Sequence, residues 1–225
     1  IYKSNMVWNF HDSYIHLPNV FYSKVKPESF NKKKLILFNK DLAKEIDLDF
    51  TKYTDEEICE ILLGKKLLGK DFYSQAYAGH QFGHFTILGD GRALLLGEHI
   101  THDNKRFDIQ LKGSGKTPYS RNGDGKAALG PMIREYIISE AMHNLGIPST
   151  RALAVLTTGE NVIRERIEPG AILIRVAKSH IRVGTFQFGS LLKKQEEFKS
   201  LIDYTINRLY PELINKDNKY INFFE

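Results

Sequence analysis

Residues 106–148 read RFDIQLKGSGKTPYSRNGDGKAALGPMIREYIISEAMHNLGIP and contain, in succession, a strand pattern, a glycine-rich loop and a helix pattern. In residues 106–112 apolar and polar side chains alternate, and this period of two predicts a half-buried strand with one polar face. Lys112 ends that strand on its polar face. A lysine at a strand end can contact nucleotide phosphates, so Lys112 is a candidate phosphate ligand.

The glycine-rich loop covers residues 113–126 and leads into the longest helix pattern of the chain. Apolar residues recur there at helical spacing, and Pro131 suits a position in the first helical turn. Gly146, followed closely by Pro148, ends the pattern. The segment therefore predicts one long helix directly after the loop.

Two glutamates on this predicted helix compete as the ion-pair partner of Lys112. An ammonium group near a low-dielectric pocket needs a carboxylate at salt-bridge distance to stay charged and oriented. Glu135 is the first candidate and Glu140 is the second. A step of five residues turns about 140° around a helix, so only one of them can face Lys112 well.

The flanking sequence predicts further strands and helices. Residues 85–97 carry a Gly-Asp-Gly turn at 89–91 between two apolar runs, which is typical of a β-hairpin. Residues 152–157 predict a strand, and residues 161–177 predict a second hairpin that turns at Glu168-Pro169-Gly170. The order of hairpin, strand, long helix, strand and hairpin indicates the α+β class, with a mainly antiparallel sheet and one packed helix.

Three shorter helices are predicted outside this region, at residues 41–48, 54–63 and 196–209. Thr54 and Glu57 form a capping-box pattern at the start of the second of these. Residues 1–40 mix aromatic and polar residues without a clear period, so we expect an extended arm that packs on the body of the protein.

Composition excludes several classes of protein. With 225 residues, 42% of them hydrophobic, and a single cysteine, the chain has the material for a core but not for an internal disulfide or a multi-cysteine zinc site. Its apolar runs are too short to cross a membrane. We therefore expect a soluble, cytoplasmic-type protein without a membrane partner.

The net charge of +5 is divided between two kinds of position. The lysine runs at 32–34 and 65–70 are typical of a solvated surface, and without an aromatic-basic motif they do not indicate nucleic-acid binding. A second basic set is interleaved with glycines and suits a phosphate-rich small ligand. It consists of Lys112, Lys116, Arg121, Lys126, Arg175, Lys178 and Arg182.

Three familiar sequence motifs are present only in incomplete form. Residues 113–117, GSGKT, end like a Walker A loop, but the first glycine of that pattern is replaced by Gln110, and Pro118 stands where its helix would begin. His80 and His84 lie in a glycine-broken segment without the glutamate of a zinc helix, so a structural role is favoured and no metal site is predicted. Ser114 is not in a nucleophile elbow.

Six motifs between Tyr77 and Phe188 together resemble the selenoprotein O family. They are YAGHQFG at 77–83, LGDGR at 88–92, LKGSGKTPYSR at 111–121, GDG at 123–125, IRE at 133–135 and HIRVG at 180–184. The resemblance implies a protein-kinase-like fold, often called a pseudokinase, in which ATP binds in a flipped orientation. It also implies a magnesium-dependent protein adenylyltransferase, which transfers AMP to Ser, Thr or Tyr hydroxyls of protein substrates and releases pyrophosphate.

The family motifs also imply roles for individual residues. Glu135 would be the ion-pair partner of Lys112, and Arg175 and Arg182 would hold the distal phosphates. Cations beyond the α-phosphate make electrostatic sense because a departing pyrophosphate gains negative charge. The ATP-binding residues implied by the motifs are Gly89, Gly91, Arg92, Lys112, Asp124, Gly125, Arg175 and Arg182.

The resemblance further implies a division of the chain and a missing part. Residues 1–76 would be an N-terminal extension, 77–190 a kinase-like N-lobe that binds the nucleotide, and 191–225 a helical connection. The catalytic base and the magnesium ligands are expected beyond residue 225, in a C-lobe absent from this chain, so this span alone is expected to be nearly inactive. The family is cytoplasmic in bacteria and mitochondrial in eukaryotic relatives.

Two other functions stay open from the sequence. The first is a true protein kinase that transfers the γ-phosphoryl group. The second is a non-catalytic module that binds a nucleotide and acts as a scaffold. The mass added to a substrate separates the first from AMP transfer, and retained ATP binding without any transfer would favour the second.

Overall fold

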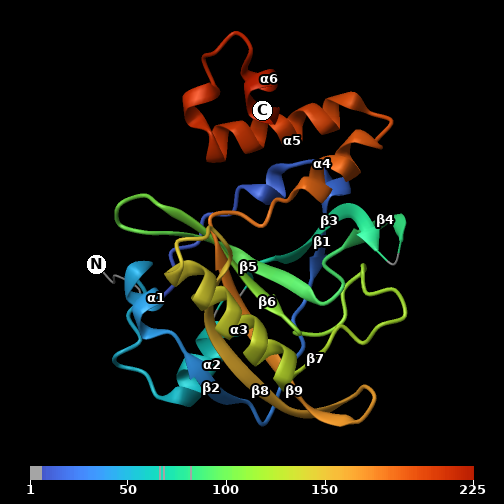
Figure 1. Ribbon diagram of the computed structural model, residues 1–225. Coiled ribbons are helices and arrows are strands. Elements are labelled where there is room, and N and C mark those ends of the chain that lie inside the picture. The colour runs from blue at the N-terminus through green and yellow to red at the C-terminus, as the bar shows by residue number, and fades with distance from the viewer. Residues whose placement is uncertain (1–6, 66, 68, 82) are drawn as a thin grey trace. The chain divides into compact units, whose positions relative to one another are not determined.

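The computed structural model describes residues 7–65, 67, 69–81 and 83–225 (Figure 1). The chain forms two compact units. The first comprises the residues up to 12 together with 24–74 and 90–180. The second comprises 13–23, 75–89 and 181–225. Among the described residues, no helix is long and apolar enough to cross a membrane.

A mainly antiparallel sheet has most of its strands in the first unit, while β4 and most of β3 belong to the second, and it confirms the predicted sheet type and the α+β arrangement. The strand order is β1-β3-β5-β6-β9-β8-β2, while β4 pairs with β3 and β7 pairs with β9. The pairs β2–β8, β3–β4, β3–β5, β5–β6, β6–β9, β7–β9 and β8–β9 are all antiparallel. The strands are β1 (Tyr22–Val25), β2 (Lys34–Phe38), β3 (Phe72–Gln81), β4 (His84–Gly89), β5 (Ala93–Ile100), β6 (Arg106–Lys112), β7 (Ala127–Ala128), β8 (Arg151–Ile163) and β9 (Ile167–Ala177).

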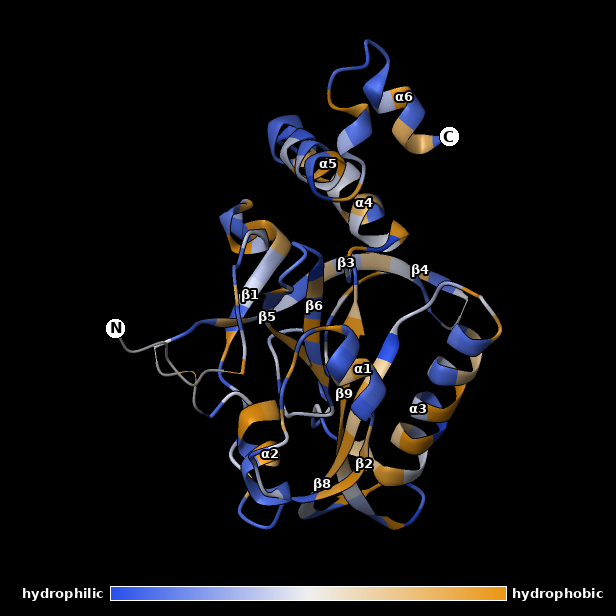
Figure 2. Ribbon diagram, turned by 90° about the vertical axis from the view of Figure 1, so that its left-hand side faces the viewer, coloured by the Kyte–Doolittle hydropathy of each residue, from blue (hydrophilic) through white to orange (hydrophobic). Residues whose placement is uncertain are grey.

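Helices cover both faces of this sheet because β8 and β9 are apolar on both sides (Figure 2). Ile172 and Ile174 of β9 belong to the large core cluster that also contains residues of α1 and α2, whereas Leu173 belongs to the cluster beneath α3. Apolar side chains point to both faces of β9, and helices therefore pack on each face of the sheet. The helices are α1 (Lys40–Glu45), α2 (Asp55–Leu62), α3 (Leu129–Asn144), α4 (Val183–Ser190), α5 (Gln195–Leu209) and α6 (Lys219–Phe224), with 3-10 turns at Tyr14–His16, Asn19–Phe21 and Pro211–Leu213.

The second unit has its own small core. Ile202, Ile206 and Leu213 are buried there against Phe186 and Phe198. Helices α4 and α5 contact each other. Helix α5 lies close to the predicted range 196–209, and α6 falls within the segment 191–225 that was expected to be helical. Helix α4 was not predicted, because its apolar residues do not follow a clear helical stripe.

Local sequence signals placed several elements correctly. Strand β6 occupies the predicted range 106–112, and α3 ends where Gly146, at φ +74°, follows its last turn. The capping box of α2 forms as predicted. Thr54 Oγ1 accepts from the Glu57 N–H at 3.4 Å, and the Glu57 carboxylate accepts from the Thr54 N–H at 2.9 Å.

Both predicted hairpins are wrong in their pairing. Strands β4 and β5 flank the 89–91 turn but do not pair with each other: β4 pairs with β3, and β5 pairs with β6 and, through Leu95, with Tyr73 of β3. The second hairpin turns at residues 164–166, because Pro169 and Gly170 stay within β9. A register irregularity between Thr157 and Asn161 lets β8 run on as one long strand.

The predicted arm at residues 1–40 is described from residue 7 onward, and it is more regular than expected. It contributes β1 and β2 to the sheet. Trp8 is 5% exposed, and its indole N–H donates to the carbonyl oxygen of Ile61 at 3.1 Å. Short strands among aromatic and polar residues give no periodic signal, so the sequence predicted packing without predicting the strands.

Candidate functional site

The polar face of β6 is buried, which differs from the predicted half-buried strand. Asp108 is 1% exposed and Gln110 is fully buried, while Lys112 at the strand end is partly exposed. A buried polar side chain needs a partner, because losing water without a replacement hydrogen bond costs about 1–3 kcal/mol. The partners of these three side chains come from segments far away in the sequence and form the candidate site.

Lys112 and Arg175 share the carboxylate of Glu135. Lys112 Nζ lies 2.5 Å from Glu135 Oε2, and Arg175 Nη1 lies 3.2 Å from Glu135 Oε1. Burial lowers the pKa of Lys112, and the neighbouring Arg175 lowers it further, against the opposing effect of Glu135. Two cations on one carboxylate leave a net positive charge in a partly buried place, which favours an anionic ligand.

Gln110 links this ion-pair cluster to the turn before β5. In the sheet Gln110 lies directly opposite Arg175, and its amide oxygen accepts a hydrogen bond from the Arg175 guanidinium. Its amide nitrogen donates to Asp90 Oδ2 at 3.3 Å. Sequence reasoning did not nominate Gln110 or Asp90. The sequence did contain a signal for Gln110, because it lies two residues before Lys112 and therefore on the same polar face of β6.

The third polar side chain of β6 holds the segment that follows β9. The Asp108 carboxylate accepts from the backbone N–H of His180 at 2.7 Å, and the imidazole Nδ1 lies 3.6 Å from the same carboxylate. Burial lowers the pKa of His180, against the opposing effect of Asp108. The contact fixes the chain where it leaves the first unit after residue 180.

The glycine-rich loop closes on itself through its glycines. The N–H of Gly115 donates to the carbonyl oxygen of Gly125 at 3.2 Å, and Ser114 bridges to Lys126. Gly125 has φ +68°, and a Cβ at this position would overlap the backbone of Gly115. The loop therefore requires glycine here for both its backbone angle and its close approach.

Replacing Gly125 by Ala is expected to disrupt this loop and to lower the free energy of unfolding. The positive φ alone costs about 1–2 kcal/mol, and the overlap with Gly115 adds to that cost. Chemical denaturation of Gly125→Ala and Gly146→Ala checks this. Gly146 is the matched control because it has φ +74° but no heavy atom within 4 Å of an added Cβ. Equal losses in the two variants would contradict the close approach.

Asp124 is held by an arginine that the sequence analysis did not nominate. Arg164 Nη1 lies 2.9 Å from Asp124 Oδ2, Nη2 lies 3.1 Å from Oδ1, and Nη2 also donates to the Lys126 carbonyl at 2.9 Å. The Arg164 guanidinium is the main cause that lowers the pKa of Asp124. This fork ties the glycine-rich loop to the 164–166 turn between β8 and β9.

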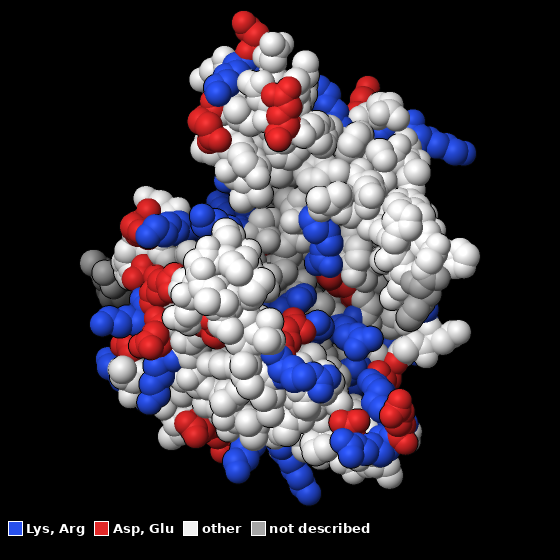
Figure 3. Space-filling view, viewed as in Figure 1, with Lys and Arg blue, Asp and Glu red and all other residues white. Residues whose placement is uncertain are grey.

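A hollow of about 670 Å³ in the first unit adjoins this loop and the beginning of α3. The charged residues of its lining are Arg92, Arg164, Glu165, Arg166 and Glu168. The first turn of α3 contains no acidic residue and no capping side chain. Gly91 is close to the loop, since a Cβ on it would lie 2.8 Å from the Tyr119 carbonyl oxygen. On the face drawn in Figure 3, basic side chains lie next to acidic ones, so the positive charge of the chain is not gathered into one continuous patch there.

Two of the predicted site residues lie in the second unit. Gly89 ends β4, opposite Ala76 of β3. Arg182 precedes α4, and its guanidinium carbon lies 4.1 Å from the ring centroid of Tyr77. In the first unit the structure brings Lys112, Glu135 and Arg175 into direct contact. Gly91, Arg92, Asp124 and Gly125 belong to the same unit as these three.

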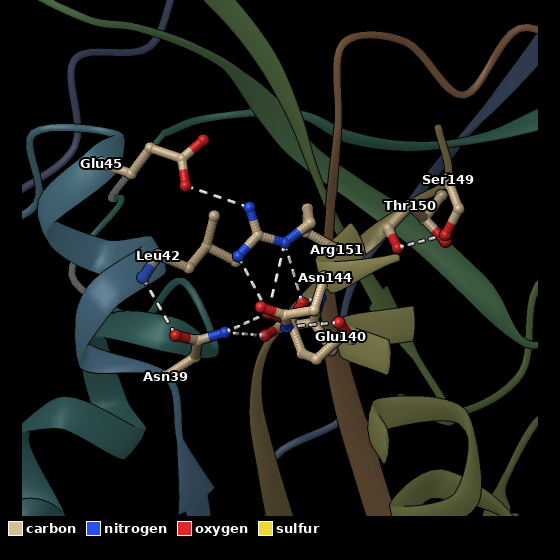
Figure 4. Close-up of polar contacts among 9 residues, drawn as sticks. Asn39, Leu42, Glu45, Glu140, Asn144, Ser149, Thr150 and Arg151 are labelled. Carbon is tan, nitrogen blue, oxygen red and sulfur yellow. Dashed lines mark hydrogen bonds and ion pairs between the residues drawn. The ribbon is translucent and has the colours of Figure 1, made fainter. Parts of the chain in front are cut away.

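Glu140, the alternative partner of Lys112, forms an ion pair with Arg151 instead (Figure 4). Its carboxylate binds Arg151 at 2.8 Å, the side-chain amide of Asn39 at 2.7 Å and the N–H of Ala152 at 2.9 Å. Arg151 also reaches Glu45 of α1 at 3.0 Å. Burial alone would raise the pKa of Glu140, but Arg151 and the N–H of Ala152 outweigh it and lower the pKa. The alternative between the two glutamates is therefore settled in favour of Glu135.

Glu140 anchors α3 to β8, so Glu140→Gln is expected to lower the free energy of unfolding by about 1–3 kcal/mol. Because the folded-state pKa is lowered, the stabilisation is fully present above the ordinary glutamate pKa of about 4.3 and is lost progressively as pH falls from there through the lower folded-state pKa. Denaturation at pH 7 and at pH 3 measures both effects. The control is Glu196→Gln in the exposed first turn of α5. A loss of stability that persists unchanged at pH 3 would contradict the ion-pair anchor.

His80 and His84 lie on strands rather than on a helix, close to the turn between β3 and β4. His80 pairs with Phe85, and their ring centroids are 5.5 Å apart. Within the described ranges, no group of three or more His, Cys, Asp and Glu side chains could hold a metal ion. The structural role predicted for His80 fits its contact with Phe85.

Comparison with known proteins places this chain in a family. The model of a family described as "Protein adenylyltransferase SelO" matches residues 5–225. Proteins named "Protein nucleotidyltransferase YdiU" are similar to this chain throughout. The one from Clostridium perfringens strain SM101 is 56% identical over 225 residues, which are 100% of this chain and 46% of that protein. The one from Brevibacillus brevis is 59% identical over 215 residues, 95% of this chain and 44% of that protein. The chain thus spans less than half the length of these relatives.

Proposed function

The chain belongs to the protein adenylyltransferase SelO family, and from this premise we propose that it is the phosphate-binding part of an enzyme that transfers AMP from ATP to protein hydroxyls. The observation that carries the proposal is the contact of Lys112 and Arg175 with one carboxylate, that of Glu135. When the bond between the α- and β-phosphates breaks, negative charge grows on the departing pyrophosphate. Fixed cations at that point stabilise the transition state more than the ground state.

The fold supports a kinase-like N-lobe as part of this proposal. An antiparallel sheet carries Lys112 at the end of β6, and α3 packs on β8 and β9 and supplies Glu135. A strand lysine held by a helix glutamate is the arrangement by which kinases bind nucleotide phosphates. We assign residues 77–190 to this lobe, 1–76 to an extension and 191–225 to a connection.

The remaining family positions receive roles under the same proposal. Arg92 lines the hollow beside the α3 N-terminus and is the proposed contact of a distal phosphate there, because the other two arginines of that lining are paired with carboxylates. The proposed ATP-binding set is Gly89, Gly91, Arg92, Lys112, Asp124, Gly125, Arg175 and Arg182. Asp124 is already engaged by Arg164, so a nucleotide that contacts its carboxylate has to share it with that arginine.

Magnesium and the catalytic base belong to the proposal but not to this chain. We assign both to the part of the relatives that this chain does not cover. When bound, magnesium would neutralise phosphate charge. The protein substrates carry Ser, Thr or Tyr hydroxyls, and a cytoplasmic location accords with the single cysteine.

The test is intact-mass spectrometry of a candidate substrate protein after incubation with the full-length protein, ATP and magnesium. The proposal expects the mass of AMP to be added. Addition of the mass of phosphate would instead show a kinase. ATP binding without any added mass on a panel of proteins would favour a non-catalytic module and contradict the proposal.

A further inference from the structure

Arg164, in the turn between β8 and β9, fixes the direction of the Asp124 side chain on the glycine-rich loop. Its two terminal nitrogens bind the two carboxylate oxygens of Asp124 at 2.9 and 3.1 Å, and one of them also donates to the carbonyl oxygen of Lys126 at 2.9 Å. A planar, bidentate pair restricts the orientation of a carboxylate more strictly than a single contact does. Asp124 is therefore oriented although it lies on an exposed loop.

The hydrogen-bonding capacity of the Asp124 carboxylate is almost filled. Its two oxygens offer about four acceptor positions. Within the described residues, three of these positions are occupied: Arg164 donates once to each oxygen, and the backbone N–H of Lys126 donates to Oδ1 at 2.9 Å. One acceptor position is left, and it belongs to Oδ2.

This remaining position is accessible, and at neutral pH it can only accept. The Asp124 side chain is 44% exposed. The Arg164 guanidinium lowers the pKa of Asp124, so the carboxylate is ionised and has no proton to donate. The ammonium group of Lys126 lies 2.7 Å from Glu160 and 3.5 Å from Glu28, so it pairs with these carboxylates rather than with Asp124.

Charge decides which kind of group can bind at Oδ2. A phosphate is repelled, because two oxygens then face each other with no proton between them. A cation gains little, because Arg164 already compensates the negative charge of Asp124. A neutral hydrogen-bond donor is favoured. ATP carries three such donors, which are the 2′-hydroxyl and the 3′-hydroxyl of the ribose and the 6-amino group of adenine.

We propose that Arg164 is a positioning residue that presents Asp124 Oδ2 as the acceptor for one of these three donors, so that Asp124 binds the nucleoside of ATP and not its phosphates. This inference rests on the proposed function, since it takes ATP as the ligand. The phosphates are left to the cations of the site, among them Lys112 and Arg175.

Isothermal titration of the full-length protein with ATP and three analogues tests this inference. The analogues are 2′-deoxy-ATP, 3′-deoxy-ATP and purine riboside triphosphate, and each lacks one of the three donors. We expect one analogue to bind about tenfold more weakly than ATP, and this penalty to disappear in Asp124→Ala. In Arg164→Met and in Arg164→Lys the same penalty should fall to about threefold or less, because neither side chain provides the guanidinium fork.

Arg166→Met is the matched control. Arg166 lies in the same turn, its side chain is 83% exposed, and its guanidinium lies 4.0 Å from Glu168. This variant should keep the full penalty. Each penalty is a ratio of two affinities measured on one variant, so a partial loss of folded protein does not change it.

Two results would overturn the inference. If no penalty disappears in Asp124→Ala, Asp124 accepts no donor of the nucleoside. If the penalty persists unchanged in Arg164→Met, Arg164 does not position Asp124. The proposed function fails in a different way: ATP binding with the expected penalties but without AMP transfer contradicts the function alone, whereas absence of ATP binding contradicts both.

Discussion

Replacing Lys112 by Met in the full-length protein is expected to lower kcat/KM for AMP transfer by a factor of about 10²–10³. The variant keeps a similar side-chain length but removes the ammonium group that lies 2.5 Å from Glu135. Glu135 is then paired with Arg175 alone, so the net positive charge of the cluster disappears. The measurement is the rate of transfer at several ATP concentrations.

Lys34→Met is the matched control, because Lys34 is an exposed strand lysine at the start of β2, outside the site. It is expected to transfer AMP at the normal rate. The largest effect of Lys112→Met should be on kcat, because the growing charge on pyrophosphate is stabilised mainly in the transition state. Normal turnover in Lys112→Met would exclude this lysine from the chemistry.

Arg175→Lys is expected to lose nearly as much activity as Arg175→Met, although it keeps the charge. The guanidinium of Arg175 contacts two partners at once, Glu135 through one nitrogen and Gln110 through the other. An ammonium group cannot reproduce this fork. We expect a decrease of about 10²-fold in kcat/KM for both variants, measured as for Lys112.

Gln110 is expected to affect activity only by positioning Arg175, because its amide oxygen accepts a hydrogen bond from the Arg175 guanidinium. Gln110→Leu should lower kcat/KM in the unaltered background, but it should have little further effect when Arg175 is already Met. Additive losses in the double variant would show that Gln110 acts independently. Denaturation of each variant separates this coupling from a general loss of stability.

Local signals in the sequence located several elements but not their partners. The period of two located β6, and a proline near the start and a glycine after the end located α3. The partners of β4 and β5 depend on β3, which both strands contact, and no turn motif contains that information. A glycine turn shows that the chain reverses there but does not show which strands pair.

The candidate site was predictable in part for the same reason. Lys112 and Glu135 followed from strand and helix patterns, and the structure joins them. The choice against Glu140 required Asn39 and Arg151, which belong to other elements. The buried polar face of β6 was missed because alternation alone describes a strand with water on one side.

The proposed function requires that Lys112 and Arg175 hold the phosphates of ATP. Titration of ATP and of adenosine into the full-length protein and into its Lys112→Met/Arg175→Met variant tests it directly. We expect the variant to bind ATP at least about 100-fold more weakly, a loss of about 2.7 kcal/mol, and to bind adenosine as well as the unaltered protein does. Equal affinity of both proteins for ATP would contradict the claim.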